Sequence, residues 1–224
     1  TTIYYTNSQF PNGSLTVQTV NYYDNYENLE ILPSAIDNQT VIGASDTKTK
    51  GLAVATLTNV LGTATWNKSY TFYDTKYVRP VASHSENYLK GHTSSASSLD
   101  FRGKALNTVT KHKLDDINTP EITINEVFNY YDNELLKSQT HQINNGPVEY
   151  IAQNSYNEIN QLISKKVGND NASTPLQTVD YKYNIRGWMT DINNVDITND
   201  DLFSFRIKYN NPYYNGEKLY NGNI

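Results

Sequence analysis

The sequence predicts an all-β fold made of consecutive antiparallel β-hairpins. Three observations support it: strand-like runs joined by Asn-Gly turns, alternation of residue types with a period of two, and a recurring aromatic–Asp motif. The 224 residues include 19 Tyr and about 30 Asn. Tyr buries a large ring while its polar tip stays wet, and Asn tolerates the left-handed backbone of turns, so this composition suits many strands joined by many turns.

Turn residues place the hairpins along the chain, because Asn-Gly between two extended runs is a strong hairpin signal. Three are predicted: residues 3–5 and 15–23 around Pro11-Asn12-Gly13, residues 136–143 and 148–156 around Asn144-Asn145-Gly146, and residues 162–167 and 176–183 around the polar loop 168–174. One domain is expected over residues 1–224. Within it, residues 34–66 are expected to form a less regular, loop-rich insertion.

Alternation identifies one strand clearly. Val179, Tyr181 and Tyr183 fall on one face of an extended chain, while Asp180 and Lys182 fall on the other. We therefore expect the two faces of this strand to differ in exposure.

Composition excludes several classes of function. The net charge is -5 with a pI near 5.3, and no basic stripe is present, so no nucleic-acid partner is expected. Without Cys there are no disulfides or thiolate metal sites, and no apolar run is long enough to span a membrane. The chain opens Thr1-Thr2 without a signal peptide, which we interpret as a mature or truncated product, or an excerpt.

No catalytic, cofactor-binding or metal-binding residues are predicted. His84, His92, His112 and His141 lack metal-like spacing, and surface or packing roles are expected for them. Adjacent carboxylates such as Asp115-Asp116 point to opposite faces of a strand and chelate poorly. The same reading applies to Asp200-Asp201. No nucleophile elbow, phosphate-binding loop or dinucleotide-binding motif occurs, so the chain is not expected to be an enzyme.

An internal repeat is the most informative feature. Full copies of an aromatic–Asp pair are Tyr22-Tyr23-Asp24, Phe72-Tyr73-Asp74 and Tyr130-Tyr131-Asp132, and degenerate copies begin at Leu99-Asp100, Tyr156-Asn157 and Tyr183-Asn184. We expect the aromatic ring to pack across strands, the Asp or Asn to cap a backbone N–H two residues on, and Gly103 or Gly187 to supply a special turn conformation. In the second copy, Tyr77 stands where we expect that Gly, and Arg79 is the surviving Arg of the motif.

Six such units in series resemble the YD repeats of RHS proteins. The flanking segments Lys50-Gly51-Leu52, Asp100 to Lys104, Ile185-Arg186-Gly187-Trp188-Met189 and Leu219 to Ile224 are similar to the Bacteroidetes branch of that family. The resemblance implies hairpins wound into a curved or spiral β-shell that encloses a toxin or other cargo. It also implies a secreted or cell-surface bacterial protein, type IX export, and the remainder of its own polypeptide as partner.

Two functions follow as alternatives. The first is a structural segment of an encapsulating RHS/YD-repeat shell, possibly of a polymorphic toxin. The second is a free-standing binding module, an adhesin or glycan binder, that presents exposed aromatics. The second predicts a groove that displays Trp66 or Trp188, whereas packing of both rings against the sheet favours the first.

Overall fold

The computed structural model describes residues 13, 16–27, 29, 35–36, 39–197, 201–212 and 216–223. In this part of the chain all regular structure is β, apart from the short 3-10 turn η1 (Thr47–Thr49). The all-β prediction is therefore confirmed. The hairpin predicted around Pro11-Asn12-Gly13 lies outside the described residues, except for Gly13 and the second run from residue 16.

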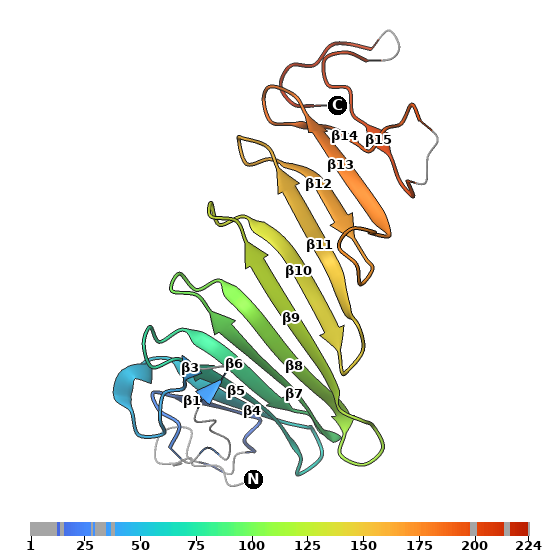
Figure 1. Ribbon diagram of the computed structural model, residues 1–224. Coiled ribbons are helices and arrows are strands. Elements are labelled where there is room, and N and C mark those ends of the chain that lie inside the picture. The colour runs from blue at the N-terminus through green and yellow to red at the C-terminus, as the bar shows by residue number, and fades with distance from the viewer. Residues whose placement is uncertain are drawn as a thin grey trace. The chain divides into compact units, whose positions relative to one another are not determined.

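Consecutive hairpins form the sheet, as the sequence predicts. The strands are β1 (Thr19–Tyr23), β2 (Ala35–Ile36), β3 (Gln39–Thr40), β4 (Ala53–Asn59), β5 (Trp66–Tyr73), β6 (Pro80–Glu86), β7 (Lys90–Leu99), β8 (Ala105–Asp115), β9 (Ile122–Tyr130), β10 (Leu136–Ile143), β11 (Val148–Tyr156), β12 (Leu162–Val167), β13 (Gln177–Tyr183), β14 (Met189–Ile192) and β15 (Phe205–Arg206). Their order in the 13-stranded sheet is β1-β4-β5 and then sequential to β15, while β2 and β3 pair separately (Figure 1).

The chain divides into two compact units, residues 1–126 and 127–224. The first contains the only cluster of buried apolar side chains in the described residues. Tyr26 and Ile42, from the connection between β1 and β4, pack there against Phe72 of β5; the Tyr26 and Phe72 rings stack with centroids 5.8 Å apart. Burying a side chain such as Phe72 contributes about 1.5–3 kcal/mol, so this connection stabilises the start of the sheet.

The segment 34–66 differs in part from its prediction as a loop-rich insertion. Residues 41–52 contain turns, η1 and an isolated bridge, but residues 53–59 form β4, a regular strand paired with both β1 and β5. Thr, Ala and Val alternate in β4, and this small-residue strand packs against the core cluster. The small residues of β4 therefore reflect close packing against the core.

Ser and Thr hydroxyl groups line one face of β4 to β8. Cross-strand pairing aligns its Ser and Thr side chains, as in the row Thr56, Ser69, Ser85 and Thr93. The Ser and Thr residues of this face are Thr56, Thr58, Ser69, Thr71, Ser83, Ser85, Thr93, Ser95, Ser97, Thr108 and Thr110. Because hydroxyls hydrogen-bond water readily, this face needs no second layer to cover it.

In the second unit, the predicted hairpins occur with almost the predicted bounds: β10 with β11, and β12 with β13. The alternation in β13 is also confirmed, since Val179, Tyr181 and Tyr183 are half-buried and their neighbours Asp180 and Lys182 are exposed. Ala152 is the only fully buried apolar residue among those described here. The unit therefore lacks a thick apolar core and depends on strand ladders and half-buried aromatic rings.

Candidate functional site

Turns of one recurring form join several pairs of consecutive strands. The turn headed by Asp100, between β7 and β8, shows its geometry. The Asp100 backbone N–H donates to the Lys104 carbonyl at 2.9 Å, and the Gly103 N–H donates back to the Asp100 carbonyl at 3.1 Å. The Asp100 side chain accepts from the N–H groups of Arg102 and Lys104 at 2.8 and 2.9 Å. Gly103 has φ +95°, a left-handed conformation that Gly adopts without steric cost. The predicted roles of Asp100 and Gly103 are therefore observed.

Asn157 and Asn184 head two further turns of this form. Each side-chain oxygen accepts backbone N–H bonds from the residues two and four positions on, at 2.8 to 3.2 Å. The residue three positions on again has positive φ: 64° at Asn160 and 78° at Gly187. The Asn carboxamide thus performs the same capping as the Asp carboxylate, as the degenerate copies of the motif suggested.

The copy at Tyr131-Asp132 has a different register from the one predicted. Here Tyr131 occupies the first turn position, since its N–H donates to the Leu135 carbonyl at 2.9 Å, and Glu134 has the positive φ of 71°. Asp132 therefore caps nothing in the expected way. Asn133 accepts from the Leu135 N–H at 3.4 Å instead. The Tyr-Asp pair lies one residue later than in the other turns, with Tyr130 as the strand-ending tyrosine.

The copy at Tyr73-Asp74 has a loop one residue longer. The Asp74 N–H donates to the Arg79 carbonyl at 2.9 Å, and Val78 adopts the positive φ of 56°. The prediction that Tyr77 replaces the motif Gly is therefore wrong, because Val78 holds that position. Arg79 Nε donates a hydrogen bond to the Asp74 carboxylate at 3.2 Å, and the Arg79 guanidinium stacks on the Tyr77 ring.

The first copy, Tyr23-Asp24, forms no tight hairpin, because β1 pairs with β4. Asp24 instead accepts from the distant Gly51 N–H at 2.6 Å, and its own N–H donates to the Leu52 carbonyl at 3.1 Å. A turn of the common form that the pattern missed begins at Asn87, which has no aromatic residue before it. The signal that identifies it is the Asn, with β7 beginning three residues later at Lys90.

Tyrosine hydroxyls connect successive repeats. Tyr73, Tyr156, Tyr183 and Tyr209 each donate to a backbone carbonyl 20 or 21 residues earlier, at 2.9 to 3.0 Å. The acceptors are Ala53, Leu136, Leu162 and Met189, each the first residue of a strand of the preceding repeat. The tyrosine of one repeat therefore fixes the strand start of the previous one. Tyr209 extends the series by a copy that the motif search missed.

Neighbouring turns also contact one another directly. In the first unit, Arg79 Nη1 donates to the Asp100 carbonyl at 2.8 Å. In the second, the Asn133 carboxamide donates to Asn160 at 2.9 Å, and the rings of Tyr131 and Tyr156 meet edge to face with centroids 6.0 Å apart. Turns at one end of the strands are thus in direct contact at one place in each unit.

Ionised carboxylates stabilise two of these turns. Burial opposes ionisation of Asp74, but hydrogen bonds from the backbone of Tyr77 and from Arg79 outweigh it and lower the pKa of Asp74. The backbone N–H of Lys104 is the main cause of the lowered pKa of Asp100. Both carboxylates are therefore charged at neutral pH and serve as hydrogen-bond acceptors within their own turns.

The histidines take structural positions. His84 and His92 stack on one face of β6 and β7 with centroids 5.6 Å apart, and burial lowers the pKa of His84. His92 and His141 each contact a Glu side chain, at 3.0 and 3.1 Å. His112 contacts the Thr93 hydroxyl at 2.8 Å. The described residues contain no group of three or more His, Asp or Glu side chains with metal-binding geometry.

Neither Trp ring forms an exposed platform. Trp66 packs against the core cluster of the first unit. Trp188 contacts Tyr209 with centroids 5.2 Å apart and lies beneath the Arg186 guanidinium. The half-buried Trp188 lines a small groove of about 270 Å³.

In the part of the chain that the structure describes, no helix is long and apolar enough to cross a membrane.

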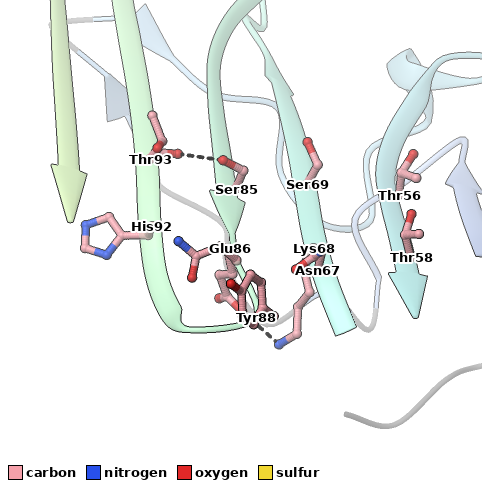
Figure 2. Close-up of a pocket in the computed structure, with 11 residues that line it drawn as sticks. Thr56, Thr58, Asn67, Lys68, Ser69, Ser85, Glu86, Tyr88, His92 and Thr93 are labelled. Atoms are coloured by element: carbon pink, nitrogen blue, oxygen red, sulfur yellow. Dashed lines mark hydrogen bonds and ion pairs between the residues drawn. The ribbon is translucent and has the colours of Figure 1, made fainter. Parts of the chain in front are cut away.

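A polar groove of about 340 Å³ lies on the hydroxyl face of the first unit. Figure 2 shows Thr56, Ser69, Ser85 and Thr93 on four neighbouring strands, with Tyr88 at one end. Ser85 donates to the Thr93 carbonyl at 3.3 Å. The Ser69 hydroxyl has no partner among the described residues, and the same holds for Thr58 and Asn67, which also line the groove. Lys68 and Glu86, paired at 3.1 Å, and His92 also line the groove. The groove can therefore hydrogen-bond a hydroxylated ligand.

Comparison with known proteins gives no assignment. No family model matches the chain, and no curated protein matches it in sequence. The function must therefore be argued from the repeated turns and their connections.

Proposed function

We propose that the chain is a structural segment of an encapsulating RHS/YD-repeat wall in a large secreted or cell-surface bacterial protein. The series of tyrosine hydroxyl bonds supports this proposal best: four bonds, each spanning 20 or 21 residues, connect a repeat to the one before it. A structure that adds repeats in this way grows in one direction without a closed core, which suits a wall.

The exposure of the sheet also supports a wall. Hydroxyls occupy one face of the first unit, and the second has a single fully buried apolar residue among those described. Both faces of such a sheet tolerate water, as the wall of a hollow container requires. Function then belongs to what the wall encloses, with the remainder of the polypeptide and possibly secretion machinery as partners.

Deletion of one repeat tests the proposal. Residues 162–188 run between equivalent positions, so joining Gln161 to Met189 removes one unit and retains the bonds of Tyr156 and Tyr209. A wall segment is expected to keep its β-sheet circular dichroism and cooperative unfolding. A matched control deletes 175–201, which has the same length but breaks the register. Equal loss of structure in both variants would contradict the proposal.

Glycan binding is a second candidate, favoured by the groove with Ser69, Asn67 and the 58% exposed Tyr88. Hydroxyls and a carboxamide suit a neutral sugar, and an exposed ring can stack on it. Titration calorimetry with neutral oligosaccharides tests it, with Asn67→Ala and Tyr88→Ala as variants. Binding that both variants abolish would favour a binding module, whereas no heat of binding leaves the wall as the function.

A further inference from the structure

The hairpin between β10 and β11 has the sequence Asn144-Asn145-Gly146 at its exposed tip. An Asn side chain reacts most readily with the next backbone nitrogen where that nitrogen belongs to Gly, because Gly puts no side chain beside it and leaves the backbone free to turn. A second such pair, Asn221-Gly222, also lies wholly within the described residues. The structure places these two pairs in different surroundings.

At the hairpin tip, the reacting groups of Asn145 and Gly146 are accessible. The Asn145 carboxamide is exposed and makes no hydrogen bond to any described residue, so no contact among them holds its Cγ away from the Gly146 nitrogen. The Gly146 N–H donates to the Ile143 carbonyl at 3.0 Å, and this bond must open before the nitrogen reacts. Because the bond closes an exposed tip, local fraying opens it without unfolding of the sheet.

Around Asn221 the corresponding groups are held in place. The Asn221 side-chain oxygen accepts the Asn223 N–H at 3.1 Å, which fixes the carboxamide in a turn of its own. Gly222 has φ +90° and lies against the Trp188 indole, where an added Cβ would be 3.3 Å from the ring. Reaction at Asn221 therefore requires a packed segment to come loose, whereas the β10–β11 tip needs only one turn bond to open.

We propose that Asn145 is a site of spontaneous deamidation and isomerisation, with water as the only other reactant. The Gly146 nitrogen gives up its proton to water and attacks Cγ of Asn145. The new N–Cγ bond forms while the bond from Cγ to the side-chain nitrogen breaks, and that nitrogen takes up a proton and leaves as ammonia. Water then opens the resulting succinimide ring at one carbonyl or the other, which gives isoaspartate or Asp.

Both products change the hairpin tip. Each adds one negative charge to a chain of net charge -5, and isoaspartate also inserts one carbon atom into the main chain between β10 and β11. Because loop length fixes the register of a hairpin, isoaspartate should loosen the bonds nearest the tip. These are the Gln142 side-chain bond to the Gly146 carbonyl at 2.9 Å and the Gly146 bond to Ile143. Neither the wall nor glycan binding requires this site, so it is tested separately from both.

Peptide mapping by mass spectrometry tests the site, after incubation of the folded chain in mildly alkaline buffer made with water labelled with heavy oxygen. We expect Asn145 to convert at least about tenfold faster than Asn221, because the segment around Asn221 must first come loose. Isoaspartate and Asp should both appear at residue 145, each with one labelled oxygen. In urea the two pairs should convert at similar rates, since both then lie in an unfolded chain.

Gly146→Ala is the matched variant, since it keeps the nitrogen but places a Cβ beside it, 3.1 Å from the Ile143 carbonyl oxygen. We expect about tenfold slower conversion of Asn145 and no change at Asn221. Equal rates at the two pairs in the folded chain would overturn the proposal, as would conversion to Asp without isoaspartate or an unchanged rate in Gly146→Ala. The comparison of folded and urea-treated chain does not depend on that variant folding.

Discussion

The hydroxyl of Tyr183 donates a hydrogen bond to the backbone carbonyl of Leu162 at 2.9 Å, 21 residues earlier in the chain. Tyr183 ends β13, and Leu162 begins the neighbouring strand β12. Burial raises the pKa of the Tyr183 phenol, so the hydroxyl stays protonated and able to donate. Because Tyr73, Tyr156 and Tyr209 make equivalent bonds, this contact holds one repeat against the next.

Replacing Tyr183 with Phe removes this bond and leaves the ring in place. We expect the change to destabilise β12 and β13 by about 0.5–1.5 kcal/mol, the usual value of one intramolecular hydrogen bond. Amide hydrogen exchange within the two strands measures it. Tyr88→Phe is the control, because the Tyr88 hydroxyl has no partner among the described residues. Equal exchange in both variants would contradict a role for the hydroxyl.

The turn headed by Asn157 depends on its side-chain oxygen, which accepts two backbone N–H bonds. Asn157→Ala leaves both donors without that acceptor, and we expect a loss of about 1–2 kcal/mol. Asn157→Asp keeps the acceptor and should recover most of the stability. Urea unfolding measures the three proteins. If Ala and Asp variants unfold at the same midpoint, backbone bonds alone form the turn.

The positive φ at two turns predicts opposite effects on stability for two substitutions, Gly103→Ala and Lys90→Gly. Gly103 has φ +95°, and the nearest side-chain atom to an added Cβ is 3.5 Å away, so Gly103→Ala meets no clash but strains the backbone. We expect a loss of about 1–2 kcal/mol. Lys90 holds the equivalent position with φ 63° and is exposed. Lys90→Gly should therefore stabilise, by about 0.5 kcal/mol. Urea midpoints that shift in the same direction would contradict the argument.

The lowered pKa of His84 predicts a loss of stability in mild acid. Burial lowers its pKa below the ordinary 6.5, while Glu86, His92 and Lys68 act on it from its own and the neighbouring strands. The folded protein therefore binds the proton less readily than the unfolded chain, and stability is full above pH 6.5 and falls as the pH drops through that value. His84→Gln should flatten this slope in urea unfolding measured between pH 8 and 5. An unchanged slope would assign it to another group.

A second window lies at lower pH. The pKa values of Asp74 and Asp191 are lowered from 3.8: burial opposes ionisation at both, but hydrogen bonds, including those from Arg79 and Arg206, outweigh it. Their stabilisation is therefore present above pH 3.8 and lost as the pH falls below it. Asp74→Asn should weaken the acid dependence of the first unit without changing that near pH 6. If Asp74→Asn instead changes the pH dependence of stability near pH 6, Asp74 and His84 do not act in separate pH ranges.

Much of the fold follows from local patterns in the sequence. The hairpins β10–β11 and β12–β13 could be predicted because Asn144-Asn145-Gly146 and the polar loop 168–174 separate clear extended runs. The capping roles of Asp100, Asn157 and Asn184 follow from their turn chemistry. These features involve residues close together in the sequence, so local propensity and side-chain chemistry decide them.

The register of the turns could not be predicted from the motif alone. Tyr131 rather than Asp132 begins its turn, and Val78 rather than Tyr77 has the positive φ, because pairing of the flanking strands fixes where each turn starts. The strand β4 was missed because its small residues pack against Tyr26 and its neighbours, a contact that no local pattern reveals. The Tyr209 bond depends on a similar distant contact.

Sequential pairing has a mechanical consequence. From β4 onward, strands hydrogen-bond to their neighbours in the chain, as β12 does to β11 and β13. Tension applied between two ends of such a meander acts across the strands and loads one outer ladder at a time. The hydrogen bonds therefore break one after another, whereas force along a pair of strands would load all of their bonds at once. A sheet made this way would therefore open at low force when one end is pulled.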